Sequence, residues 1–369
     1  MKLLKSILAF ISFMGLGFVG GWLISSFLST SLQTIDVPAS QGWLLLPLTI
    51  ICFLLAGILQ IAIHEAGHVF FGWLTGYRFL SYRLLNLHWQ RVDGKLKLFR
   101  HSLAGTAGQA LMIPPQPVEG KIPYVLSNLG GGLANLITLP LCYGLTYFIP
   151  QFALLWDTLA FFGLIGALTN LIPLGKTFPN DGYNIYSIAK HPLGSLYFYA
   201  QLAVHAQMTQ GVPYQDMPKD LFLIPEKEDI TNPIIFSASL NWVNRLMAME
   251  QFEEARNYLD SLAIDQQPLS QIYRVLGKIT LSYLELLCQQ TTSIPFDKED
   301  WKLIGALSKS QPMAAVFAYA YHSLVDGDDK KAEQALEQFT KLAKTYPYPV
   351  DYADEASRLQ RFQDIMKTK

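Results

Sequence analysis

One long apolar stretch of this chain contains a charged pentapeptide, and this combination constrains the fold more than any other feature. Residues 43–63 are 21 residues without a charge, residues 64–68 have the sequence HEAGH, and the apolar character then continues to Tyr77. About 20 apolar residues are enough for a helix to cross the hydrocarbon core of a bilayer. Ionisable groups inside such a helix are energetically costly and mark functional sites. We therefore expect a membrane-spanning helix that carries a functional polar site.

Three further uncharged stretches predict additional membrane spans. Residues 6–28 are 23 residues without a charge, and residues 122–156 and 158–175 are separated only by Asp157. A secretory signal peptide is the alternative for residues 6–28, but the run is longer than a usual signal core. Core helices of a large soluble protein are a second alternative, which would need much more chain to cover them. We expect four transmembrane helices.

The distribution of basic residues predicts the direction of these spans. Lys and Arg in short loops mark the cytoplasmic side of a membrane protein. Residues 78–121 carry seven basic groups, whereas residues 29–42 and 149–157 carry none. We therefore expect a multi-pass protein of the bacterial plasma membrane, with residues 29–42 outside and with residues 78–121 and both termini in the cytoplasm.

The composition excludes several classes of protein. A chain with 51% hydrophobic and 15% charged residues is not expected to be disordered. Its net charge of −1 lacks the basic excess that binding to nucleic-acid phosphates requires, so we expect no nucleic-acid partner. Cys52, Cys142 and Cys288 are far apart in the sequence, and they predict neither a disulfide framework nor a thiolate metal site.

The pentapeptide has the spacing of a zinc site. On a helix, residues i and i+4 share one face, so His64 and His68 can bind one Zn²⁺ while Glu65 acts on a metal-activated water. The alternative is structural, with two hydrogen-bonded histidines and a paired carboxylate packed between helices. Because the motif lies within an apolar span, where such groups are costly, we favour the metal site.

Three later motifs, together with HEAGH, resemble the site-2 protease family of intramembrane zinc metalloproteases. They are SNLGGGLAN at residues 127–135, NLIP at residues 170–173 and NDG at residues 180–182. The similarity covers roughly residues 43–190. It implies a polytopic membrane protease that cuts membrane-embedded peptide segments.

The resemblance also implies a role for each polar residue of the site. His64 and His68 would be two zinc ligands, Asp181 would be the third, and Glu65 would be the catalytic base. From the residues alone, other groups on the cytoplasmic side, including a histidine at position 88 or 101, stay open as a third ligand.

Asn135 matches the asparagine of a Gly-Pro-x-x-Asn motif in that family, with Gly132 at the proline position. As a catalytic residue it would donate a hydrogen bond to the oxyanion or orient the substrate. A packing role in a glycine-rich helix crossing is the alternative.

The segment between the second and third spans predicts β-structure. Residues 79–101 alternate in polarity around Asp93-Gly94, which is typical of a hairpin with a tight turn. Residues 111–115 are apolar but too short to span, and they fit a re-entrant loop. A strand at the membrane edge can pair with an unwound substrate through its backbone. An amphipathic hairpin on the membrane surface is the alternative.

The C-terminal half predicts a cytosolic helical domain. Residues 207–233 are polar and rich in proline, which indicates a linker between a membrane domain of residues 1–206 and a domain of residues 234–369. Paired amphipathic segments near residues 240–259 and 314–336 resemble tetratricopeptide-type helical hairpins, although their offset is not a multiple of that repeat. We expect this domain to bind a protein partner or the membrane domain; a structural tail is the alternative.

The sequence thus predicts an α-helical polytopic membrane protein that acts as an intramembrane zinc metalloendopeptidase. Its expected partners are the lipid bilayer and a membrane-embedded peptide or protein substrate. A membrane zinc protease of the prenyl-protein type is one alternative, but its third ligand is a later glutamate, and after Glu65 the membrane half has only Glu119. A non-proteolytic scaffold or immunity-type sensor that retains the zinc site is the other.

Overall fold

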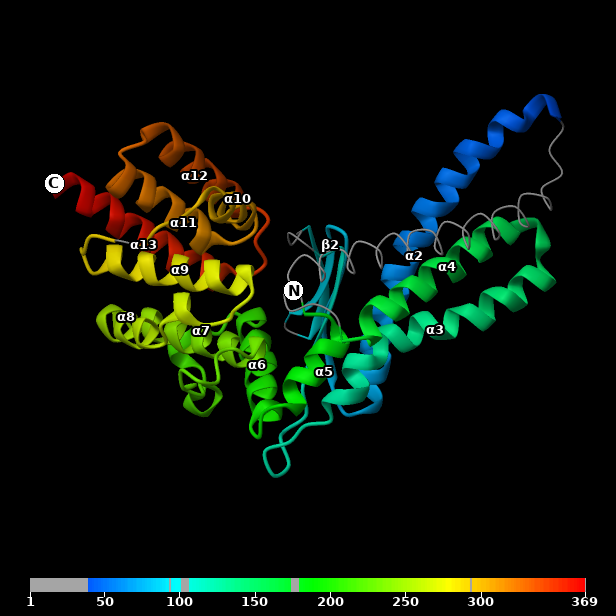
Figure 1. Cartoon of the computed structure of the whole chain (residues 1–369), viewed down its shortest axis with the longest axis horizontal. Coiled ribbons are helices and arrows are strands. Elements are labelled where there is room, and N and C mark those ends of the chain that lie inside the picture. Colours follow the sequence, from blue (N-terminus) through cyan, green and yellow to red (C-terminus); the bar gives the residue numbers. More distant parts are fainter. Residues whose placement is uncertain (1–38, 93, 101–105, 174–178, 293, 369) are drawn as a thin grey trace, which may run out of the picture. The chain divides into compact units, whose positions relative to one another are not determined.

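The chain is mostly helical. The computed structural model describes residues 39–92, 94–100, 106–173, 179–292 and 294–368 (Figure 1). These ranges contain twelve α-helices and one four-stranded antiparallel sheet. The predicted helical class is therefore confirmed, whereas the predicted first span, residues 6–28, lies outside the described residues.

Three helices of the described chain are long and apolar enough to cross a membrane. They are α2 (Leu45–Leu74), α3 (Tyr124–Phe148) and α4 (Ala153–Leu171). Large apolar side chains on them are widely exposed, with 64% of Leu54 and 79% of Phe148 accessible. Such exposure is unfavourable in water and suits a hydrocarbon environment. Three of the four predicted spans thus have a helix of suitable length and composition.

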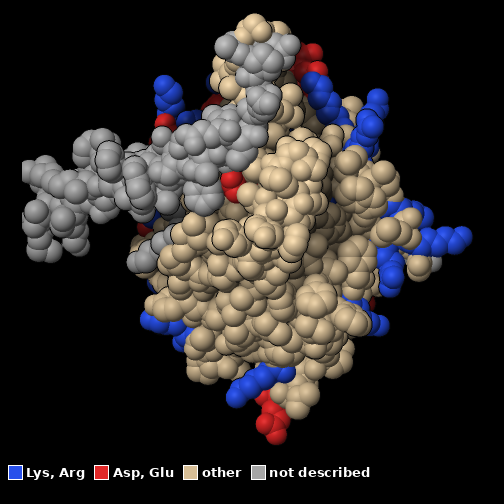
Figure 2. Space-filling view, turned by 90° about the vertical axis from the view of Figure 1, so that its right-hand side faces the viewer, with Lys and Arg blue, Asp and Glu red and all other residues tan. Residues whose placement is uncertain are grey.

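Charged side chains are sparse on the side where these helices lie. Figure 2 shows a broad face of uncharged residues there, with Lys and Arg mainly around its margin. The short turn Pro150–Phe152 between α3 and α4 is also uncharged. A broad surface with few charges is typical of segments that face lipid.

The chain divides into two compact units. The first comprises the described residues up to Gly67 together with Gly130–Leu171. The second comprises His68–Leu129 together with the described residues from Ile172 onward. One division falls within α2 and another within α3, so both helices contribute to both units. The domain boundaries predicted at residues 206 and 234 stay a prediction.

A small antiparallel sheet follows α2 in the chain. Gly94 lies in the turn between the second and third strands with φ +75°, a conformation that favours glycine, and these strands form the predicted hairpin. The predicted first arm is two strands, since Leu85 has φ +55° and interrupts it. The prediction of a re-entrant loop at residues 111–115 was wrong, because residues 111–113 form part of a strand that pairs with the first strand. In spatial order the strands are β3 (Lys95–Arg100), β2 (Leu87–Val92), β1 (Arg78–Leu84) and β4 (Gly108–Ile113).

The buried face of this sheet is polar. Ser81 pairs with Gln90 and Arg83 pairs with His88, and all four side chains are at most 2% exposed. Gln90 Nε2 donates to the carbonyl oxygen of Thr209 at 2.9 Å. Burying polar groups is tolerated only where they find hydrogen-bond partners. This bond therefore ties the sheet to the end of the helix that contains Thr209.

In the described part of the chain, nine more helices follow the membrane-spanning candidates, and the last seven of them share one core. Its buried residues extend from Ile230 to Ile365. Consecutive helices pack together at both of the pairs predicted from the sequence, α7 with α8 and α11 with α12. The tetratricopeptide-like character stays a prediction. The helices are α5 (Asp181–Ala189), α6 (Gly194–Thr209), α7 (Pro233–Ala248), α8 (Phe252–Ser261), α9 (Gln271–Leu287), α10 (Lys298–Leu307), α11 (Pro312–Tyr321), α12 (Asp329–Leu342) and α13 (Pro349–Thr368).

The segment predicted as a linker is packed against its neighbours. Tyr214, Met217 and Phe222 are buried in one cluster with residues of α6 and α7. Arg245 of α7 is 3% exposed, and its guanidinium donates to the carbonyls of Tyr214 at 2.9 Å and Met217 at 2.8 Å. These bonds satisfy a buried charge and hold the segment in a defined conformation.

Candidate metal centre

Helix α2 presents the two histidines of the HEAGH motif on one face. His64 and His68 are one turn apart, and the helix is continuous through both. Each is half-buried, and Glu65 between them is half-buried as well. The helical geometry inferred from the i, i+4 spacing is therefore present.

Asp181 reaches this face of α2 from the first turn of α5. Asn180 caps that helix, with its Oδ1 accepting from Tyr183 N at 2.8 Å. The Asn180 Nδ2 also donates to the carbonyl of Ile172 at 2.7 Å. One side chain thus links the start of α5 to the residue that follows α4. With its helix start held in this way, Asp181 Oδ2 lies 3.3 Å from His68 Nε2.

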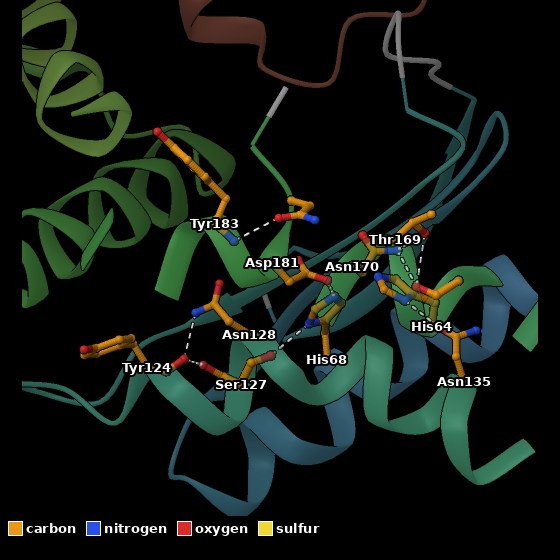
Figure 3. A network of polar contacts seen from close by, with 12 residues as sticks. His64, His68, Tyr124, Ser127, Asn128, Asn135, Thr169, Asn170, Asp181 and Tyr183 are labelled. Carbon is orange, nitrogen blue, oxygen red and sulfur yellow. Dashed lines mark hydrogen bonds and ion pairs between the residues drawn. The ribbon is translucent and has the colours of Figure 1, made fainter. Parts of the chain in front are cut away.

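Among the described residues, His64, His68 and Asp181 form a group that can hold a metal ion (Figure 3). Their ligand atoms all lie within 4.8 Å of one another. Two atoms that each bind one tetrahedral metal at about 2.1 Å are roughly 3.4 Å apart. Small side-chain rotations would therefore bring three ligands to one ion. His88 lies in β2 and is not in this group, and His101 is outside the described residues.

A backbone carbonyl orients His68. The His68 Nδ1 lies 2.8 Å from the carbonyl oxygen of Ser127. A carbonyl oxygen only accepts, so Nδ1 carries the hydrogen and donates it. The lone pair of the neutral ring is then on Nε2, the atom that faces Asp181. Metal-binding histidines usually donate their second N–H in this manner.

Asn135 orients His64 in the equivalent way. Its Oδ1 lies 2.6 Å from His64 Nδ1, and its Nδ2 donates to Gln60. The asparagine is 1% exposed and lies on α3. The structure therefore places Asn135, a predicted catalytic residue, at the Nδ1 side of the His64 ring. Gln60 and Ser127 were not predicted as site residues, although Gln60 precedes His64 by one helical turn in an otherwise apolar run.

Glycine allows α2 and α3 to approach closely at this site. A Cβ on Gly67 would lie 2.3 Å from the carbonyl oxygen of Gly130 and 2.6 Å from Ala134 Cβ. Gly132, at the position of the family's proline, faces Leu171, whose Cδ2 would be 2.5 Å from an added Cβ. Small residues at helix crossings permit this backbone approach in membranes.

Replacing Gly67 with alanine is expected to destabilise the protein, since backbone atoms would have to move. Overpacking typically costs about 1–3 kcal/mol. Gly57→Ala on the same helix is the matched control, because the nearest atom to its Cβ, Phe162 Cζ, would be 3.9 Å away. Thermal unfolding of both variants in detergent checks this, and equal unfolding temperatures would contradict the close crossing.

Comparison of the chain with protein-family models, with curated proteins and with solved structures finds no match. The likeness to site-2 proteases therefore rests on the motif residues quoted above. The geometry around His64, His68 and Asp181 is independent of that likeness.

Proposed function

We propose that the protein is an intramembrane zinc endopeptidase of the site-2 protease type, which cleaves membrane-embedded peptide segments. The observation that carries this proposal is the grouping of His64, His68 and Asp181 on and beside α2, a helix long and apolar enough to span a membrane. Two neutral imidazoles and one carboxylate are a donor set common in hydrolytic zinc sites. The three ligand atoms lie within 4.8 Å of one another, close enough for one ion to bind all three after small side-chain rotations.

In the proposed reaction, His64, His68 and Asp181 hold the metal and Glu65 transfers protons. Bound zinc would polarise the scissile carbonyl and lower the pKa of a water molecule. Glu65 accepts a proton from that water as its oxygen adds to the carbonyl carbon. The C–N bond then breaks, and Glu65 delivers the proton to the leaving nitrogen. Peptide and water are thus converted to a carboxylic acid and an amine.

The proposed orientation in the bacterial plasma membrane follows the basic residues, with residues 29–42 outside and the C-terminus in the cytoplasm. The C-terminal helices would then form a cytosolic surface for a protein partner. A reporter that works only in the cytoplasm is expected to be active when it is fused after Lys369, and a reporter that works only outside the membrane is expected to be inactive there. A fusion active only outside the membrane would refute this orientation.

Comparative membrane proteomics of cells with wild-type protein and with Glu65→Gln tests the proposed activity. Membrane proteins that are substrates are expected to accumulate uncut in the variant. Identical peptide profiles, combined with full zinc binding by both proteins, would instead support a non-proteolytic role for the zinc site.

A further inference from the structure

We propose that Gln60 is a positioning residue which, through Asn135, fixes the tautomer of His64 so that the metal-binding lone pair is on Nε2. The inference deepens the proposed function, because it concerns the same metal site. A chain of hydrogen bonds starts at the Leu159 carbonyl of α4 and ends at the His64 ring.

The first bond determines the orientation of the Gln60 amide. Gln60 Nε2 lies 2.7 Å from the carbonyl oxygen of Leu159. A carbonyl oxygen can only accept, so the NH₂ group of Gln60 must face α4. The Gln60 Oε1 consequently faces the opposite way and is available only as an acceptor.

The second bond determines the orientation of the Asn135 amide. Asn135 Nδ2 is 2.5 Å from Gln60 Oε1 and 3.3 Å from the Gln60 carbonyl oxygen. Rotating the Asn135 amide by 180° would bring its Oδ1 against these two acceptors. The NH₂ group therefore stays toward Gln60, and Oδ1 stays toward His64.

The third bond determines the His64 tautomer. Asn135 Oδ1 accepts, and it lies 2.6 Å from His64 Nδ1. The imidazole must therefore carry its hydrogen on Nδ1, and the lone pair of the neutral ring lies on Nε2. Since both Nδ2 hydrogens of Asn135 have acceptors on Gln60, this assigns Asn135 a positioning role in place of the oxyanion contact predicted from the sequence.

The hydrogen-bonded side chains of Gln60 and Asn135 are buried and tightly packed. Gln60 is 4% exposed and Asn135 is 1% exposed, so water does not replace a lost partner easily. Two glycines of α4 make the space for the amides. A Cβ on Gly163 would lie 2.8 Å from Gln60 Nε2, and one on Gly166 would lie 3.2 Å from Asn135 Cγ. Polar groups buried among apolar helices are costly, which is consistent with a functional role.

Gln60→Met removes both hydrogen-bonding groups at similar side-chain length, and it frees the Asn135 amide to rotate. Removing a group that orients a metal ligand typically lowers metal affinity by about 10–100-fold. Asn135→Asp is the conservative rescue, because its carboxyl group can accept from His64 Nδ1 in either protonation state. Asn135→Leu offers neither group. Thr138→Val is the structural control, since this buried α3 hydroxyl donates to Ala134 of its own helix.

The test measures two properties of the purified full-length variants. Zinc affinity is measured by competition with a chromophoric chelator. The His64 tautomer is measured at alkaline pH by ¹⁵N NMR of the zinc-free protein labelled at histidine, with the His64 signal assigned by its loss in His64→Gln. We expect an Nδ1–H tautomer in wild type, Thr138→Val and Asn135→Asp, and an altered tautomer with about 10–100-fold weaker zinc binding in Gln60→Met and Asn135→Leu.

An unchanged His64 tautomer in Gln60→Met would overturn the inference. So would equally weak zinc binding by Thr138→Val and Gln60→Met, because loss of any buried polar group would then suffice. If the wild-type protein binds no zinc, the proposed function fails. The tautomer measurement on the zinc-free protein still decides whether Gln60 and Asn135 set the His64 tautomer. If Gln60→Met does not fold, Gln60→Leu, which also lacks both hydrogen-bonding groups, takes its place in the same two measurements.

Discussion

Replacing Glu65 with glutamine is expected to abolish peptide hydrolysis while zinc stays bound. The amide has nearly the shape of the carboxylate but cannot accept a proton at neutral pH. His64 and His68 keep their places on α2, since neither is altered. General-base catalysis typically contributes about 10²–10⁴-fold to the rate, so hydrolysis should fall by at least this range. Cleavage of a membrane peptide in detergent and the zinc content of the same sample measure both quantities.

Glu119→Gln is the matched control for this substitution. Glu119 is the other glutamate of the membrane half, and its side chain is exposed. We expect wild-type hydrolysis and full zinc content in the control. Loss of zinc from Glu119→Gln would favour a glutamate as third ligand, as in the prenyl-protein type of protease. Appreciable hydrolysis by Glu65→Gln would remove Glu65 from its assigned role.

Replacing Asp181 with alanine is expected to reduce bound zinc and hydrolysis together. The change removes the one carboxylate of the ligand group, and two histidines alone leave the ion with too few protein ligands for a hydrolytic site. The loss of affinity should exceed the roughly 10–100-fold that is typical of residues which only orient a ligand. Equilibrium dialysis with a zinc chelator measures the affinity, and peptide cleavage measures the activity.

Two controls separate this ligand role from a structural one. Asp181 occupies the first turn of α5, where a negative charge also stabilises the helix by about 0.3–1 kcal/mol. Asp181→Asn keeps the side-chain shape, so its loss of stability should not exceed the roughly 0.3–1 kcal/mol of the missing helix-end charge, whereas its zinc affinity should fall clearly. His88→Ala should keep its zinc, because His88 is outside the ligand group. Full zinc stoichiometry in Asp181→Ala would place the third ligand elsewhere.

Local features of the fold could be predicted because they depend on short stretches of sequence. Uncharged runs of about 20 residues predict helices of spanning length, and α2, α3 and α4 have them. Alternating polarity around Gly94 predicted the hairpin of β2 and β3. Residues 111–113 were assigned wrongly, because a short apolar segment fits a loop or a strand until its pairing partner is known.

The hydrogen-bond partners of the site could not be predicted in the same way. Ser127 and Asn135 lie on a different helix from the histidines they orient. Gln60 could have been noticed as a polar residue one turn before His64, but its role depends on Leu159 of α4. Such contacts require the packing of helices far apart in the chain, which no local pattern specifies.

By itself, the sequence determined that His64 and His68 share one face of an apolar helix, because a helix repeats every 3.6 residues wherever it forms. Only the tertiary structure decided that Asp181 meets them and that Asn135 orients His64. The physical reason is one of range. Helical periodicity acts over a few residues, whereas these contacts depend on a glycine at position 67 that permits close helix crossing and on a cap that holds the start of α5.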